Sequence, residues 1–241
     1  MRNLPQVSQV LVALTALSIT NIALADEEHE HEGHSDIEVV VEDGQLVIEN
    51  GEALSGGGKL FESEFGEQIN PNLSSEPGFE VDDGMFLADE ILGFQTVGTL
   101  LSWDGAAWGA AAATDYLDVI DGEFSVFTYS ATSATAGTGI IESADSEGGI
   151  HHHVDFEIDT AATSGAYLIE MVLLGLDSAG ETTVYDTSES LYVAFNFNME
   201  EEAFEFAVES FNPAPVPVPA ALPLLLSGLF GVFAVARRKK N

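Results

Sequence analysis

The side chains best suited to chemistry are six histidines, which fall in only two places along the chain. Three lie in an acidic stretch near the N-terminus and three are consecutive: His29, His31 and His34, then His151, His152 and His153. The chain has no cysteine, which excludes disulfides, thiolate metal sites and cysteine nucleophiles. Imidazole and carboxylate groups are therefore the available metal ligands, and imidazole suits Zn, Cu, Ni or Fe better than Ca or Mg.

The second cluster lies in residues 150–158, whose alternating apolar residues predict one β-strand. Alternation places His151, His153 and Asp155 on one face and His152 on the apolar face, where we expect a backbone carbonyl to hold it. His151 and His153 are the predicted ligand pair, with Asp155 as third ligand or as the group that orients them. His34, which precedes the first predicted strand, is the expected third imidazole. The alternative is a solvated polar strand face that binds no metal.

The N-terminal histidines allow two interpretations. His29 and His31 alternate with acidic residues immediately after the apolar N-terminus. They form either a flexible chelating arm that gives accessory metal ligands or an acidic tail without a specific ligand.

The pattern of short apolar runs and turns predicts a mainly β protein, a single antiparallel β-sandwich over residues 37–210. This fold would have to position the candidate ligands. Residues 37–41 and 45–49 predict a hairpin with Asp43-Gly44 at the turn. Further predicted strands are 97–103, 116–120, 124–129, 150–158, 166–176, 182–185 and 191–198. The apolar run 167–174 is expected to be a central strand, with 192–197 as its neighbour. Residues 51–83 read as a long loop, and 105–113 stay undecided.

The charge of the chain is strongly one-sided. The chain holds 41 acidic and 6 basic residues, and between residues 26 and 212 all 41 acids face a single lysine, Lys59, for a formal net charge of −40. This excludes binding to bare nucleic acid, because phosphate would be repelled. Such a surface also predicts stabilisation by salt, as in a protein of marine or saltier water, although a generally acidic secreted protein is the alternative.

Both ends of the chain are apolar and read as targeting segments. Arg2, an apolar run and Ala23-Leu24-Ala25 form the secretory pattern, with cleavage expected after Ala25. At the other end, a proline-alternating segment precedes residues 220–236, which are uncharged and long enough for a short membrane span. The final basic cluster is expected to stop transfer and stay in the cytoplasm: Arg237, Arg238, Lys239 and Lys240.

The order of proline motif, apolar helix and basic end resembles the PEP-CTERM class of bacterial sorting tails, in particular its VPLPA-type variant. The residues that carry the resemblance are Val216, Pro217, Val218, Pro219 and Ala220 with Ala221, although Val218 stands where the variant has Leu and no Pro-Glu-Pro is present. The resemblance covers about the last 26 residues and implies a membrane-embedded exosortase as partner. It also implies an exported protein that is tethered to the inner membrane and then passed to the cell surface.

A second resemblance concerns the metal. His34-Ser35-Asp36-Ile37, with a His-rich strand before a long apolar strand, is similar to PEP-CTERM surface proteins repressed by the zinc-uptake regulator. By position it implies zinc handling by five residues: His34, Asp36, His151, His153 and Asp155.

Enzyme signatures are absent from the sequence: there is no Gly-x-Ser-x-Gly elbow, His-Glu-x-x-His helix or EF-hand loop. We therefore expect a non-enzymatic, exported protein that binds a divalent transition metal, Zn²⁺ first. The first alternative is a structural or adhesive component of an extracellular matrix, with polysaccharide as a partner, and a hydrolase is a third interpretation. The expected divisions are a signal peptide (1–25), a His- and acid-rich arm (26–36), the β-sandwich (37–210), a Pro-rich linker with the sorting motif (211–219), a transmembrane helix (220–236) and a basic cytoplasmic tail (237–241).

Overall fold

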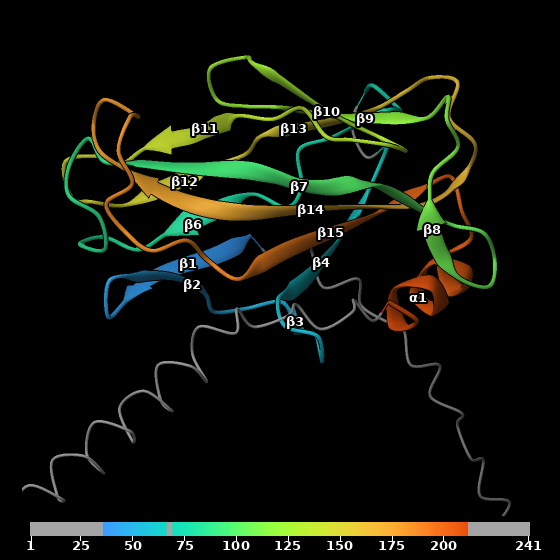
Figure 1. Cartoon of the computed structure of the whole chain (residues 1–241), viewed down its shortest axis with the longest axis horizontal. Helices are drawn as coiled ribbons and strands as arrows, with labels where there is room; N and C mark the ends of the chain where they lie inside the picture. Colours follow the sequence, from blue (N-terminus) through green and yellow to red (C-terminus); the bar gives the residue numbers. More distant parts are fainter. Residues whose placement is uncertain (1–35, 67–68, 212–241) are drawn as a thin grey trace, which may run out of the picture. The chain divides into compact units, whose positions relative to one another are not determined.

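The computed structural model describes residues 36–66 and 69–211, and these residues fold mainly as β-structure (Figure 1). The strands form three sheets. The sheet that matters most for chemistry has the order β12-β6-β1-β2, and we call it the N-terminal sheet. Its strands are β1 (Ile37–Glu42), β2 (Gln45–Ile48), β6 (Phe79–Val81) and β12 (Ile150–His152).

The other two sheets complete the fold. A second four-stranded sheet has the order β10-β9-β13-β5, from β5 (Leu73–Ser74), β9 (Tyr116–Ile120), β10 (Val126–Ser130) and β13 (Asp155–Ile158). The large sheet has the order β11-β7-β14-β15-β4-β3, with β8 paired to β7. Its strands are β3 (Glu52–Ala53), β4 (Lys59–Glu64), β7 (Ile91–Trp103), β8 (Trp108–Ala110), β11 (Thr138–Ser143), β14 (Gly165–Leu176) and β15 (Ser190–Phe197).

The predicted N-terminal hairpin is confirmed. β1 and β2 pair antiparallel, with Glu42 opposite Gln45. Asp43 and Gly44 form the turn and both have positive φ, 50° and 85°. Two residues of positive φ are what a type I′ turn requires, and Asp-Gly is one of the pairs that tolerate it.

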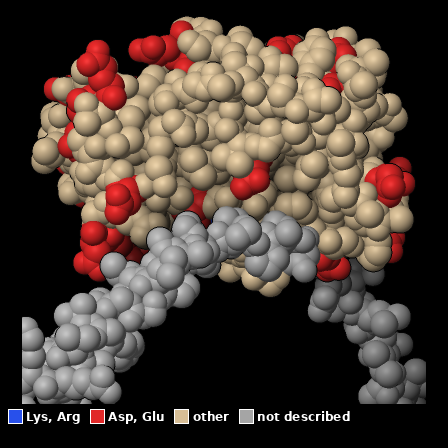
Figure 2. Space-filling view, viewed as in Figure 1, with Lys and Arg blue, Asp and Glu red and all other residues tan. Residues whose placement is uncertain are grey.

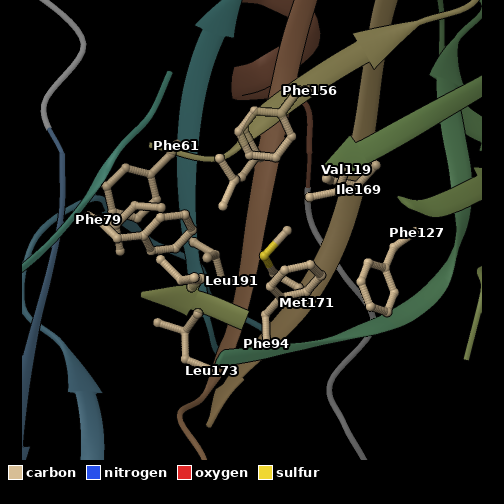
Figure 3. Close-up of a cluster of buried hydrophobic side chains, with 14 of the residues drawn as sticks. Phe61, Phe79, Phe94, Val119, Phe127, Phe156, Ile169, Met171, Leu173 and Leu191 are labelled. Carbon is tan, nitrogen blue, oxygen red and sulfur yellow. The ribbon is translucent and has the colours of Figure 1, made fainter. Parts of the chain in front are cut away.

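The core lies between one face of the large sheet and the two smaller sheets. β14 and β15 pair antiparallel along their length, as the apolar runs predict, and alternate residues of both strands are buried in a single hydrophobic cluster. Figure 3 shows side chains from different sheets pointing toward one another, among them Met171 of β14, Phe79 of β6 and Phe156 of β13. The fold is therefore a layered, sandwich-like β domain. It is not purely antiparallel, because β1 pairs with β6, and β15 with β4, in parallel.

The opposite face of the large sheet packs against a helix that the sequence patterns did not predict, α1 (Glu201–Glu209). Phe204, Ala207 and Val208 of α1 are buried in a second cluster with residues of β14 and β15. The indole Nε1 of Trp108 donates a hydrogen bond of 2.8 Å to the Ala207 carbonyl, which ties α1 to β8 (Figure 1). Two glutamates in its first turn favour the helix electrostatically.

Three of the expected strand and loop assignments are wrong. The stretch 150–158 is two strands, β12 and β13, in different sheets. The stretch 51–83 is not a long loop, because β3, β4, β5 and β6 lie in it. Residues 182–185 form no strand; there, Thr183 makes an isolated bridge with Leu176.

The predicted targeting segments lie outside the described residues, as do His29, His31 and His34. The same is true of the linker from residue 212, the sorting motif, the predicted span 220–236 and the basic end. Within residues 36–66 and 69–211, the structure contains no helix with the length and apolar character that crossing a membrane requires.

The surface of the described domain is acidic, and salt is expected to stabilise it. Figure 2 shows carboxylates scattered over one face, where no Lys or Arg side chain of the described residues is visible. Raising NaCl from low concentration to 1 M shortens the Debye length to about 3 Å and screens this repulsion. We expect the melting temperature to rise by about 5 °C, a gain of roughly 1–2 kcal/mol for a chain of this size. Thermal melts at low and high NaCl, in a buffer that contains a metal chelator, measure this change. A melting temperature that does not change or falls as NaCl is raised contradicts the expectation.

Candidate metal centre

Three side chains with ligand atoms converge on the outer face of the N-terminal sheet. Asp36 lies immediately before β1, His151 lies in β12, and His153 directly follows β12. The Nε2 atom of His151 is 3.0 Å from Asp36 Oδ2, and the Nε2 atom of His153 is 3.9 Å from Asp36 Oδ1. One ligand atom of each residue lies within 4.8 Å of the other two, so a single ion can contact all three. We call these residues the triad.

The strand register explains why the triad forms. β6 lies between β1 and β12, with Glu80 opposite both Glu38 and His151. Moving along the register by two residues places Gly78 level with Asp36 on one side and His153 on the other. Because alternate residues share a face, the triad stands on the exposed side of the sheet while Ile37 and Phe79 point into the core.

Gly78 leaves the space that the triad uses. A Cβ atom at this position would lie 2.6 Å from Asp36 Oδ1 and 2.6 Å from His153 Cε1. The side chains from the two flanking strands therefore meet over a residue that has none. The Gly78 N–H also donates a hydrogen bond of 3.2 Å to Asp36 Oδ1, which holds this carboxylate over the gap.

Neighbouring groups set the orientation of His153. Its Nδ1 atom is 2.9 Å from the Ser75 carbonyl oxygen and 3.5 Å from Glu76 Oε1. A carbonyl only accepts, so Nδ1 is the donor in this contact, and the neutral imidazole then has its lone pair on Nε2, on the side of Asp36. A metal-binding histidine typically uses its second nitrogen in this way.

The backbone of Asp36 is also held in place. The side-chain amide of Asn50 donates a hydrogen bond of 2.6 Å to the Asp36 carbonyl. Two residues of the triad are therefore oriented by contacts outside it. His151 is the more open member, with 63% of its side chain exposed, against 34% for His153 and 20% for Asp36.

The triad offers two imidazole nitrogens and one carboxylate oxygen. This set fits Zn²⁺ and other divalent transition metals, and it suits Ca²⁺ and Mg²⁺ poorly because those ions prefer oxygen ligands alone. The triad contains His151, His153 and Asp36 of the predicted residues, but not Asp155. Asp155 opens β13 in a different sheet, opposite Ile120 of β9, because the chain leaves the N-terminal sheet after His153.

His152 points to the other side of β12, as alternation predicts, but its partner differs from the expected backbone carbonyl. Its Nδ1 atom is 3.3 Å from Glu142 Oε2 of β11. This pair links the edge of the N-terminal sheet to the large sheet and leaves His152 outside the triad.

Sequence reasoning missed Glu76, Gly78 and Glu80, because all three lie in the stretch that reads as a loop. Phe79-Glu80-Val81 alternates apolar and polar residues, and this short pattern is the sequence signal for β6.

The triad adjoins an acidic hollow. Its lining includes His151 and five carboxylates: Glu80, Asp82, Asp83, Glu142 and Asp145. Hydrogen bonds from the backbone N–H groups of Glu147 and Gly149 lower the pKa of Asp145 and tie its carboxylate to its own loop. The hollow therefore carries negative charge next to the triad, which favours the approach of cations and opposes that of anions.

Comparison with protein-family models, with curated proteins and with solved structures finds no significant match to this chain.

Proposed function

We propose that this chain is an exported, surface-sorted, non-enzymatic protein that binds a divalent transition metal, Zn²⁺ first, through Asp36, His151 and His153. The observation that carries the proposal is the convergence of the three ligand atoms over Gly78. The two strands that bring them together belong to distant parts of the chain. The hydrogen bond of His153 Nδ1 to a carbonyl supports it further, since this bond leaves Nε2 for the metal.

The residues before β1 extend the proposal. His34 is two residues from Asp36 in the sequence. It is the first candidate for an additional imidazole, and His29 and His31 are accessory ligands on the same arm. The signal peptide and the sorting tail are proposed to take the protein through an exosortase at the inner membrane to the cell surface.

The test is calorimetric titration of the metal-free full chain with Zn²⁺, repeated with His151→Ala/His153→Ala. One equivalent with submicromolar affinity is expected for the natural chain. The double variant is expected to lose at least ~100-fold in affinity, about 2.7 kcal/mol, because two of the three described ligands are gone.

His152→Ala is the matched control, since it removes an imidazole from the same strand but not from the triad. Its affinity should stay within about threefold of the natural chain, well under 1 kcal/mol. Weak, multi-site binding that is equal in all three proteins contradicts the metal function. That result favours instead a structural or adhesive matrix protein, and binding to extracellular polysaccharide becomes the next measurement.

A further inference from the structure

The triad leaves a coordination position to fill. Zinc sites that hold rather than activate the ion are almost always four-coordinate and closed by protein ligands. Asp36, His151 and His153 supply three ligands. A fourth ligand from the described residues must lie on the same face of the N-terminal sheet, close to His151 and Gly78.

Glu80 lies at this position. It is directly opposite His151 in the antiparallel pair of β6 and β12, and such partners have Cβ atoms about 4.5–5.5 Å apart. It also follows Gly78 by two residues, so it shares the exposed face over which the triad meets. A glutamate has two methylene groups with which its carboxylate can lean toward an ion held there.

The Glu80 carboxylate is also available. Among the residues that the structure describes, it takes part in no hydrogen bond or ion pair. Hollows lie on both sides of it, one lined with His151 and one with Glu38, so its side chain has room to change rotamer.

Other nearby carboxylates are less suitable. Asp82 and Asp83 follow the end of β6, on the side of Glu80 that is further from Gly78. Glu142 pairs with His152, and Asp145 accepts hydrogen bonds from its own loop. Glu76 lies beside Nδ1 of His153, the nitrogen that faces away from the triad. Glu38 is one strand further from His151 than Glu80 is.

Local charge favours the same arrangement. Glu38 and Glu80 are register partners in the parallel pair of β1 and β6, so their like charges lie side by side and repel each other. A divalent ion contacted by Glu80 removes this repulsion, so the carboxylate gains by turning toward the metal.

We propose that Glu80, rather than His34, is the fourth metal ligand, which gives a site of two imidazole nitrogens and two carboxylate oxygens. His34 is then an accessory imidazole, as His29 and His31 are. The inference rests on the proposed function, since it concerns the same site. A ligand set with two hard oxygens selects Zn²⁺, Co²⁺ or Mn²⁺ over Cu⁺, which prefers thiolate and thioether ligands.

The test compares Glu80→Gln with Glu38→Gln in the full chain. Both variants remove one negative charge from the same face, but only one removes the proposed ligand. Glu80→Gln is expected to weaken Zn²⁺ binding about 10–100-fold, the range found even for residues that only support a ligand. Glu38→Gln should stay within about threefold of the natural chain.

The visible absorption spectrum of the Co²⁺-loaded proteins gives a second measurement, which does not depend on long-range charge. Four-coordinate Co²⁺ absorbs strongly in the visible range. A site that loses a protein ligand and takes up two or more waters becomes five- or six-coordinate, which weakens this band. We expect the weakened band in Glu80→Gln and an unchanged band in Glu38→Gln.

The outcomes separate the two proposals. If both variants lose affinity equally and keep the Co²⁺ band, Glu80 acts only through charge and the inference is overturned, while the metal function stands. The inference is also overturned if Glu80→Gln binds as the natural chain does. If His151→Ala/His153→Ala binds as the natural chain does, the metal function itself fails.

Discussion

Gly78→Val is expected to abolish stoichiometric zinc binding while the β domain stays folded. Even the Cβ atom would lie 2.6 Å from both Asp36 Oδ1 and His153 Cε1, and the two γ-carbons of valine need more space. Both ligands must then move away from the position where they meet. The displaced atoms are the ends of exposed or half-buried side chains, so the core below the sheet is not disturbed.

The loss should exceed that from any single ligand substitution, since one change displaces two ligands and fills the space of the ion. Calorimetry with Zn²⁺ measures it, and circular dichroism checks the fold. Gly109→Val is the matched control, because Gly109 lies in a strand of the large sheet with open space around its added Cβ. Retention of tight binding in Gly78→Val would show that the ion does not sit over Gly78.

Phe195→Ala is expected to reduce the free energy of unfolding by about 3–5 kcal/mol, the usual cost of removing a buried phenylalanine ring. Phe195 is fully buried in β15. Its ring centroid is 5.0 Å from those of Phe65 and Phe156, which belong to different parts of the sandwich. The cavity would therefore open where the layers meet, and neighbouring side chains can fill it only in part.

Urea denaturation measures this change, and the melting temperature should fall by roughly 6–20 °C. Phe206→Ala serves for comparison, because Phe206 lies on α1 with 59% of its surface exposed. Its cost should stay below about 1 kcal/mol. Equal losses in the two variants would contradict the assignment of the core to the space between the sheets.

The parts of the fold that could be predicted are those that local pattern specifies. The β1–β2 hairpin follows from two β-branched runs around Asp43-Gly44, and the pairing of β14 with β15 follows from two long apolar runs. Each depends on residues close in sequence or on runs with few alternatives.

The rest depends on contacts between distant segments. β6 has three residues, too few for alternation to stand out from a Gly- and Glu-rich stretch. Its parallel pairing with β1 depends on the long connection between them, which carries no register signal. The sequence also gives no sign that a strand ends near His153. The apolar alternation continues through Val154 and Phe156, although the chain passes from one sheet to another there.

The candidate metal site, like the fold, could be predicted only where local sequence patterns indicate it. Residue type and spacing selected His151 and His153, and a family resemblance selected Asp36. Strand alternation then extended the set wrongly to Asp155, because it assumed one strand where there are two. Gly78 and Glu80 could not be chosen without the position of β6, since a glycine and a glutamate have no distinguishing feature in such a sequence.

Asp36 and His151 are neighbours in space but about 115 residues apart along the chain. An ion that binds both is therefore a reversible cross-link that closes a loop of most of the domain. An ion that binds only the native arrangement adds about 2.7 kcal/mol at a free concentration 100 times its dissociation constant. Under the proposed function, the free zinc concentration around the protein then governs how long each copy resists proteolysis, and copies folded during scarcity are the first to be degraded.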